Sequence, residues 1–206
     1  KRISLIKDNF YELGVGFKEG KFDWERFNEP FMDSGIPSSM NFNQGYTTEI
    51  NLQANAWVKS LYDFLDDGVV FLIDYGMTES EYFHPQRSQG TLKCFSNHKS
   101  NDDPFINIGK QDITASINFS HVAKSAEDCG FEVSGYTTQS MFLISLGIEK
   151  YLKNEENEEK RVKIAQEIKQ LVLPGTMGEV FKVMALSKKQ SVKLDGFKEL
   201  DLTNRL

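Results

Sequence analysis

The apolar positions of the chain follow two different periods, which predicts a mixture of helices and strands. Residues 49–67 carry apolar side chains at steps of three and four, so we expect an amphipathic helix that ends near Gly68. Residues 69–74 then form a continuous apolar run, VVFLID, typical of a parallel-sheet strand that is buried on both faces. The predicted inner face of the helix consists of Ile50, Ala54, Trp57, Leu61 and Phe64.

The second half of the chain repeats this succession of helices and strands. Asn118 can cap a helix over residues 119–129, which Gly130 would close. This succession predicts an α/β sheet with crossover helices. We expect strands at 131–137 and 181–187 and helices at 139–153 and 156–172, the last with an inner face of Val162, Ala165, Ile168 and Leu171.

Two further stretches lack the helical period. Residues 2–17 predict two short strands around a turn at Asp8-Asn9, and residues 18–45 predict an irregular loop with a short helical turn near Trp24–Phe27. Residues 77–117 are polar and irregular, and so long a loop is usually functional. We therefore divide the chain into an N-terminal hairpin and loop (1–45), an α/β part (46–187) and a C-terminal tail (188–206).

Composition and charge restrict the classes of function. The net charge is −6, and no basic cluster is longer than Lys188-Lys189, so nucleic acid is not an expected partner. No apolar run approaches the roughly 20 residues of a membrane span. The two cysteines form no Cys-x-x-Cys pair, which favours a reducing compartment. Because the sequence starts at Lys1 without a signal-peptide pattern, we expect it to begin inside a longer gene product.

Candidate chemistry lies after the strands and in the long polar segment. In α/β sheets, catalytic groups gather outside the carboxyl ends of the strands, where Asp74, Tyr75 and Gln139 are expected. His84 could accept a proton from a substrate nitrogen. Arg87 could clamp a carboxylate, or could instead pair with an acidic residue such as Asp112 and order the segment.

Two other patterns in the polar segment leave their role open. Gln111 and Asp112 could place an amide and a carboxylate beside a cleft, although Asp112 could equally be an Asx-turn residue. Cys94 and His98 are four residues apart and could bind zinc together with His84 and Asp74. A lone Cys-x-x-x-His pair is a weak signal, so a metal site is the less favoured interpretation.

Several longer phrases resemble one known family, the MidA-like methyltransferases, and they cover residues 46–187 in the expected order. The resemblance implies a class I, Rossmann-like S-adenosylmethionine-dependent fold, with a mostly parallel seven-stranded sheet and a final antiparallel strand. Residues 69–74, 131–137 and 181–187 would be its fifth, sixth and seventh strands, the seventh at or near the edge. The phrases are LIDYG at 72–76, YFHPQRSQGTL at 82–92, DPF at 103–105, GKQDIT at 109–114, GYTTQ at 135–139, LPGTMGE at 173–179 and FKV at 181–183.

The resemblance also implies a function. Mitochondrial relatives methylate an arginine of a respiratory complex I subunit, so we expect S-adenosylmethionine as cofactor and a protein arginine as substrate, one candidate being a respiratory-complex subunit. A carboxylate such as Asp112 would hold the guanidinium. We expect a bacterial cytoplasmic protein, or a mitochondrial matrix protein in a eukaryote. The expected catalytic residues are Asp112 and His84, and the expected substrate-binding residues are Asp74, Tyr75, Arg87, Gln111 and Gln139.

One part of the family pattern is not found in the sequence. Relatives bind the cofactor on a glycine-rich turn, whereas the nearest match here, Gly14-Val15-Gly16-Phe17-Lys18-Glu19-Gly20, is one residue too long for G-x-G-x-x-G. We therefore expect only the C-terminal part of the fold, without a cofactor site and inactive alone. The alternatives are a catalytically silent interaction or assembly module and a metal-dependent hydrolase. An incomplete sheet would also favour self-association through its exposed edge.

Overall fold

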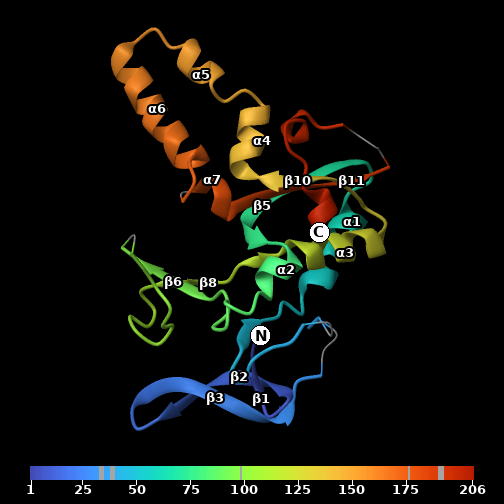
Figure 1. The fold of residues 1–206 in the computed structure, drawn as a ribbon, viewed down its shortest axis with the longest axis vertical. Helices are drawn as coiled ribbons and strands as arrows, with labels where there is room; N and C mark the ends of the chain where they lie inside the picture. Colours follow the sequence, from blue (N-terminus) through green and yellow to red (C-terminus); the bar gives the residue numbers. More distant parts are fainter. Residues whose placement is uncertain (33–34, 38–39, 98, 176, 190–192) are drawn as a thin grey trace. The chain divides into compact units, whose positions relative to one another are not determined.

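The computed structural model describes residues 1–32, 35–37, 40–97, 99–175, 177–189 and 193–206. The chain forms two compact units (Figure 1). Unit 1 consists of Lys1–Gln53 and Ser80–Ser116, and unit 2 consists of Ala54–Glu79 and Ile117–Leu206. Helices and strands occur together, so the predicted mixed α/β class is confirmed.

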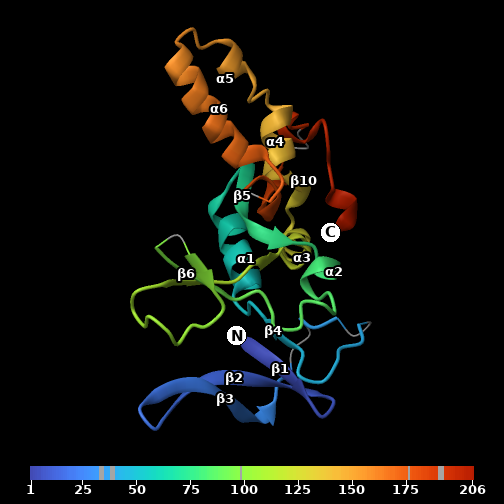
Figure 2. The same cartoon turned by 60° about the vertical axis from the view of Figure 1, so that its left-hand side comes forward.

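Unit 1 contains a four-stranded antiparallel sheet with the order β3-β2-β1-β4 (Figure 2). Its N-terminal hairpin is confirmed, but the turn lies at Lys7 and Asp8, whose φ angles are 47° and 67°. This is one residue earlier than predicted, and Asn9 already belongs to a strand. The strands are β1 (Arg2–Ile6), β2 (Asn9–Lys18), β3 (Lys21–Pro30) and β4 (Thr47–Glu49).

The predicted irregular loop over residues 18–45 is wrong at Lys21–Pro30, which form β3, and the helical turn at Trp24–Phe27 is wrong with it. The described residues between Phe31 and Gly45 belong to no helix or strand, as predicted. Glu19 and Gly20 have φ angles of 51° and 78°, and two consecutive positive values are the geometry of a tight hairpin turn. The three-residue spacing of Trp24 and Phe27 imitates a helix, but in a strand it places the two rings on opposite faces.

A second, three-stranded sheet of unit 1 has the order β7-β6-β8. Its strands are β6 (Lys93–Ser96), β7 (Lys99–Asn101) and β8 (Asp112–Thr114), and the short helix α2 (Glu79–Tyr82) precedes them. The segment 77–117 is therefore more regular than predicted. The buried apolar residues of unit 1 include Ile3, Leu5, Tyr46, Ile50, Tyr82, Phe83 and Cys94.

Unit 2 contains a sheet with the order β10-β11-β5-β9. The last long strand, β11, is antiparallel to both of its neighbours, while β9 is parallel to β5. The predicted final antiparallel strand is confirmed: β5, β9 and β10 run in one direction and β11 runs against them, although the long ladders that the structure describes are not the parallel pairs expected of a mostly parallel sheet. The reason is that β11 lies between β5 and β10, so both long ladders are antiparallel. The strands are β5 (Gly68–Met77), β9 (Ile117–Asn118), β10 (Glu132–Thr138) and β11 (Phe181–Lys188).

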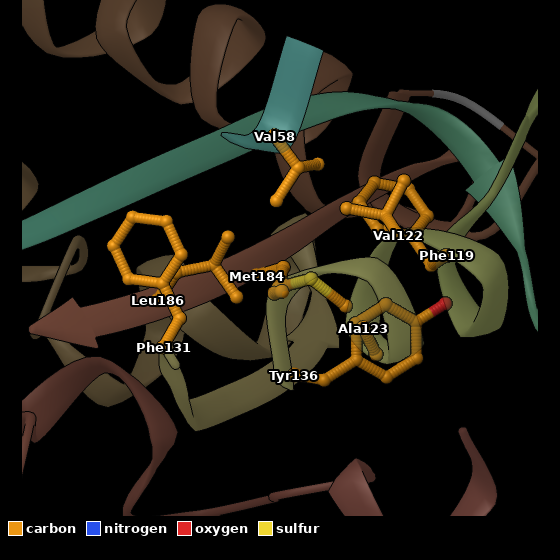
Figure 3. Packing of buried hydrophobic residues seen from close by; sticks show 9 residues of the cluster. Val58, Phe119, Val122, Ala123, Phe131, Tyr136, Met184 and Leu186 are labelled. Carbon is orange, nitrogen blue, oxygen red and sulfur yellow. The ribbon is translucent and has the colours of Figure 1, made fainter. Parts of the chain in front are cut away.

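One face of this sheet packs against two helices, α1 (Ala54–Phe64) and α3 (Phe119–Cys129). The predicted ends of α3 are confirmed: the Asn118 side chain accepts a hydrogen bond from the backbone N–H of His121, and Gly130 closes the helix with φ 100°. Figure 3 shows Val58 of α1 and the α3 side chains Phe119, Val122 and Ala123 around Tyr136, Met184 and Leu186 of the sheet.

The predicted inner face of the first helix is partly wrong. Trp57 is 48% exposed and Phe64 is 90% exposed, although both belong to the apolar stripe. Two members of the predicted face are confirmed, since Ala54 is buried and Leu61 packs on the core. The other core contacts come from Val58 and Tyr62, and from Leu65 directly after the helix. The helix also begins at Ala54 rather than at residue 49, because Thr47–Glu49 belongs to β4 of unit 1.

The other face of the sheet packs against α4 (Gln139–Ser145) and the 3₁₀ helix η1 (Asp195–Phe197). The predicted helix 139–153 is split into α4 and α5 (Lys150–Lys153), because Gly147 between them has φ 79°. In α6 (Glu158–Val172) the side chain of Val162 is 52% exposed, so its assignment to an inner face is wrong. The remaining short helices are α7 (Met177–Val180) and η2 (Thr203–Arg205).

Candidate functional site

A buried carboxylate organises the polar segment of unit 1. The Glu49 carboxylate accepts hydrogen bonds from Arg2 Nη1 at 3.0 Å, from the Thr91 backbone N–H at 2.6 Å and from the Thr91 hydroxyl at 3.0 Å. The Arg2 and Glu49 side chains are only 13% and 11% exposed. Because a carboxylate removed from water must be paired and hydrogen-bonded, this network fixes Thr91 against β4.

Further contacts hold the residues that precede Thr91, and we call residues 82–91 the anchored turn. The Tyr82 hydroxyl donates to the Glu49 carbonyl at 3.1 Å, and Arg2 Nη2 donates to the Gln89 carbonyl at 3.1 Å. Gly90 has φ 76°, and a Cβ on it would lie 2.5 Å from Glu49 Oε1. Glycine is therefore required here both for its conformation and for the approach of the carboxylate.

The anchored turn presents His84 and Arg87 at the surface of unit 1. His84 is exposed, and its Nδ1 accepts a hydrogen bond from the backbone N–H of Gln86 at 3.2 Å. Arg87 is half-buried and donates from Nε to the Glu81 carbonyl at 3.1 Å. Among the described residues Arg87 forms no ion pair with Asp112, so the alternative that such a pair orders the segment is wrong.

Gln111 and Asp112 lie at the start of β8, and their side chains differ in their contacts. Gln111 Oε1 accepts from Asn101 Nδ2 at 3.1 Å, and Gln111 Nε2 donates to the Asp103 carbonyl at 3.0 Å. The Asp112 carboxylate is exposed and accepts no hydrogen bond from any residue that the structure describes. The Asp112 carboxylate therefore closes no Asx turn. Gln111 is the residue that joins the start of β8 to residues 101 and 103.

In unit 2, Asp74 and Tyr75 lie inside β5 rather than after it, because the strand extends to Met77. The exposed Asp74 lies opposite Lys182 in the ladder, and the Tyr75 ring packs against Phe181 in a tilted arrangement with ring centroids 4.1 Å apart. At Gly76 a Cβ would lie 2.4 Å from the Phe119 ring. The glycine of the LIDYG phrase thus allows β5 to pack closely on the start of α3.

Gln139 is buried at the start of α4, where Thr138 caps the helix. Its Nε2 donates to the Leu171 carbonyl at 3.1 Å, which joins α4 to the end of α6. The predicted site residues thus form three groups of sequence neighbours, His84 with Arg87, Gln111 with Asp112, and Asp74 with Tyr75, while Gln139 belongs to α4 of unit 2. The first two groups belong to unit 1 and the third belongs to unit 2. Their binding and catalytic roles stay predictions.

The sequence interpretation missed Glu49. The signal was a single acidic residue in the TTEI stretch at 47–50, which alternates polar and apolar residues directly before the predicted helix. Burial around the network has a further consequence, since it raises the pKa of the phenols of Tyr46 and Tyr82 to about 12. Both phenols therefore stay neutral at physiological pH.

The metal hypothesis has little support. Cys94 is fully buried and free, and burial raises the pKa of its thiol, which disfavours the thiolate that zinc binds. His98 lies outside the described residues. Within the described ranges, no three His, Cys, Asp or Glu side chains gather closely enough to hold a metal ion. In the same ranges every helix is too short or too polar to cross a membrane.

The residues that the structure describes do not form a glycine-rich cofactor turn. Gly14 and Gly16 lie inside β2, where added Cβ atoms would meet Phe27 and Glu25 of the neighbouring strand at 2.6 Å in each case. No helix follows them, because the chain turns into β3. These glycines let the side chains of Phe27 and Glu25 lie over β2, so the Gly14–Gly20 stretch does not fit the phosphate- or nucleotide-binding turn of a cofactor site.

The sheet of unit 2, with an antiparallel strand between β5 and β10 and helices on both faces, defines a methyltransferase-like α/β protein. Residues 1–137 match the model of a family described as "Putative S-adenosyl-L-methionine-dependent methyltransferase". The chain belongs to this family, whose cofactor is S-adenosylmethionine. A search of curated proteins finds none that matches.

Two solved structures from Burkholderia thailandensis are similar along the whole chain. One is an uncharacterised protein in its native form, with 32% sequence identity and a TM-score of 0.92. The other, a member of the same superfamily bound to S-adenosyl-homocysteine, has 32% identity and a TM-score of 0.91. Both matches cover 100% of this chain but only 56% and 54% of the Burkholderia chains, so this chain spans just over half of their length.

Proposed function

We propose that this chain is part of an S-adenosylmethionine-dependent methyltransferase that acts on protein arginine, in which it supplies residues that bind the substrate. The family match and the relative that binds S-adenosyl-homocysteine support methyl transfer. The MidA-like relationship, a respiratory-complex subunit as the methylated protein, and a cytoplasmic or matrix location belong to the proposal and rest on the sequence resemblance alone.

The observation that carries the proposal is the exposed Asp112 carboxylate, which has no hydrogen-bonding partner among the described residues. The side chain of its neighbour Gln111 makes two hydrogen bonds. These bonds hold the backbone at the start of β8 in place, and with it the position of the Asp112 carboxylate. A carboxylate binds a guanidinium group through two parallel hydrogen bonds. Asp112 would hold the substrate arginine in this way and accept the proton that the nitrogen releases when it is substituted.

The anchored turn would supply two further contacts. Because His84 Nδ1 accepts a hydrogen bond, the neutral ring carries its proton on Nε2 and acts there as a donor. This makes Asp112 the better proton acceptor and gives His84 an orienting role. The Nη atoms of Arg87 form no ion pair with a described residue and could bind a carboxylate of the substrate protein.

The test uses a chimaera, the Burkholderia protein in which this chain replaces the part that it matches. We expect Asp112→Asn to lower methyl transfer to protein arginine about 100-fold, because it removes a charged partner of the transition state. Binding of S-adenosyl-homocysteine should stay within about threefold. Asp102→Asn, another exposed carboxylate of the same segment, is the matched control and should keep full activity.

Amino-acid analysis of the labelled protein identifies the methylated residue. Methyl groups on a residue other than arginine would contradict the proposed substrate. Equal losses of activity and of S-adenosyl-homocysteine affinity in Asp112→Asn would contradict the role of Asp112.

A second candidate is a catalytically silent interaction or assembly module. The observation in its favour is that the described residues lack a fitting cofactor turn. A chimaera that binds S-adenosyl-homocysteine but methylates no protein in a cell extract would support this candidate.

A further inference from the structure

A row of three side chains crosses the three-stranded sheet of unit 1, in which β6 and β8 lie side by side (Figure 1). Phe95 of β6 lies opposite Asp112 of β8 in one antiparallel ladder and opposite Ser100 of β7 in the other. Residues that lie directly opposite each other in an antiparallel ladder project to the same face, with Cβ atoms about 5 Å apart. The Phe95 ring and the Asp112 carboxylate are therefore neighbours on one face of the sheet.

This face is open to water along the row. Phe95 is 37% exposed, and Ser100 and Asp112 are exposed as well. Cys94, the preceding residue of β6, projects to the opposite face and is fully buried. The strand thus buries one side through Cys94 and presents a phenylalanine ring to solvent on the other. Ser100, the neighbour of this ring on β7, is too small to cover it.

A lysine on the same face is already paired with another residue. Lys93 lies opposite Thr114, which places it diagonally from Asp112. Its ammonium group forms an ion pair with Asp102 at 2.5 Å. In the part of the chain that the structure describes, no lysine or arginine lies over the Phe95 ring, and none pairs with Asp112. The ring and the carboxylate are therefore both available to a cation from outside.

An aromatic face beside a carboxylate is complementary to one planar cation. A guanidinium group donates parallel hydrogen bonds from its edge, and it spreads its charge over a flat surface that stacks on aromatic rings. It can therefore bind the carboxylate and the ring at the same time. The ammonium group of lysine is compact and strongly hydrated, and it has no flat face. The pair of Phe95 and Asp112 thus fits an arginine side chain better than a lysine side chain.

We infer that Phe95 makes this site selective for arginine, because its ring stacks on the guanidinium group that Asp112 holds. The inference rests on the proposed function, since it takes arginine as the residue that binds at Asp112. It adds a division of roles between the two residues. Asp112 accepts the proton and acts on the transition state, whereas stacking on Phe95 is the same before and during methyl transfer. Phe95 is therefore a substrate-binding residue that affects KM rather than kcat.

The first experiment measures the kinetics of the chimaera with the capped peptide Gly-Gly-Arg-Gly-Gly. Phe95→Leu keeps an apolar side chain but removes the ring, so KM should rise about tenfold while kcat stays within about twofold. Phe95→Tyr keeps the ring and should retain the original KM. Phe22→Leu, at a similarly exposed phenylalanine of β3, is the matched control and should change neither constant. An unchanged KM in Phe95→Leu, or an equal rise in Phe22→Leu, would overturn the inference.

The second experiment requires no methyl transfer. Proton NMR follows the same peptide as the chimaera is added, and the δ-methylene protons of the arginine should move upfield, because an aromatic ring shields protons that lie over its face. The matched lysine peptide should bind about fivefold more weakly. Phe95→Leu should abolish the upfield shift and bring the two affinities within about twofold. Equal affinities in the original chimaera, an upfield shift that persists in Phe95→Leu, or no binding of the arginine peptide would contradict the role of Phe95.

The two proposals fail on different results. A chimaera that binds the arginine peptide with this selectivity, but methylates another residue or none, overturns only the proposed function. Arginine methylation with the same KM in the chimaera and in Phe95→Leu overturns only the role of Phe95.

Discussion

The anchored turn and β5 reverse the usual relation between polarity and burial. The anchored turn has a polar sequence, yet Thr91 is buried and the Glu49 carboxylate beside it is almost fully enclosed. β5 has the most continuous apolar run in the chain, yet Phe71 and Ile73 are exposed. The comparison teaches that polar groups such as the Glu49 carboxylate and the Thr91 hydroxyl can be buried where they hydrogen-bond to each other, while an apolar strand is only as buried as the neighbours that are present.

The largest effect is expected from Glu49→Ala. The substitution leaves the Arg2 guanidinium buried without its partner and the Thr91 N–H without an acceptor, so the free energy of unfolding should fall by about 3 kcal/mol. Urea unfolding of the whole chain measures this change. Asp63→Ala, which breaks an exposed ion pair with Lys59, is the control and should cost less than about 0.5 kcal/mol. A similar loss in both variants would contradict the role of Glu49.

The neighbouring phenols predict a loss of stability at alkaline pH. Because burial raises the pKa of Tyr46 and Tyr82 to about 12, the folded protein holds these protons more tightly than the unfolded chain does. Their contribution is complete below about pH 10 and is lost as the pH rises towards 12, by about 2 kcal/mol for each phenol. Urea unfolding between pH 8 and 12 measures it, and the double variant Tyr46→Phe with Tyr82→Phe should show a flatter profile. An equally steep profile would refute this assignment.

Gly90→Ala tests the closeness of the anchored turn to Glu49. The new Cβ would lie 2.5 Å from Glu49 Oε1 and the residue would keep φ 76°, so we expect a loss of about 2 kcal/mol. Gly109→Ala has a similar φ of 73° but open space around it, and should cost only about 1 kcal/mol. Thermal unfolding compares the two variants. Equal losses would show that only the backbone conformation matters.

The smallest effect is expected on β5. Ile73→Ala should lower the free energy of unfolding of the isolated chain by no more than about 1 kcal/mol, because half of the side chain is already in water. Val183→Ala, directly opposite on β11 and fully buried, should cost about 2 kcal/mol. An equal or larger loss for Ile73→Ala in the isolated chain would break the comparison.

The parts of the fold that could be predicted from the sequence are those specified by local chemistry. The cap at Asn118 and the glycine at 130 determine both ends of α3, and the β-branched runs indicate β5 and β11. β3 could not be found in this way, because its turn at Glu19-Gly20 lacks the usual Asn-Gly or Asp-Gly signal. The inner face of α1 was misjudged because Trp57 and Phe64 are apolar but exposed.

The candidate site was predictable as a set of residues but not as a set of contacts. Asp112 and Gln111 are neighbours in the sequence. Only the structure shows that the Asp112 carboxylate accepts no hydrogen bond from a described residue, whereas the Gln111 amide makes two. The Glu49 network joins residues 2, 49 and 91, which are distant in sequence, and no local pattern connects them. Long-range ion pairs of this kind follow from the tertiary fold alone.

The position of β11 between β5 and β10 also governs the order in which the sheet can form during synthesis. β5 ends at Met77 and β10 at Thr138, but neither can pair with β11 until residues 181–188 have left the ribosome. At a translation rate of about 5 to 20 residues per second, the roughly one hundred residues between β5 and β11 take about 5 to 20 seconds to synthesise. During that interval the VVFLI strand is without its main partner, which makes the nascent chain a natural client for chaperones.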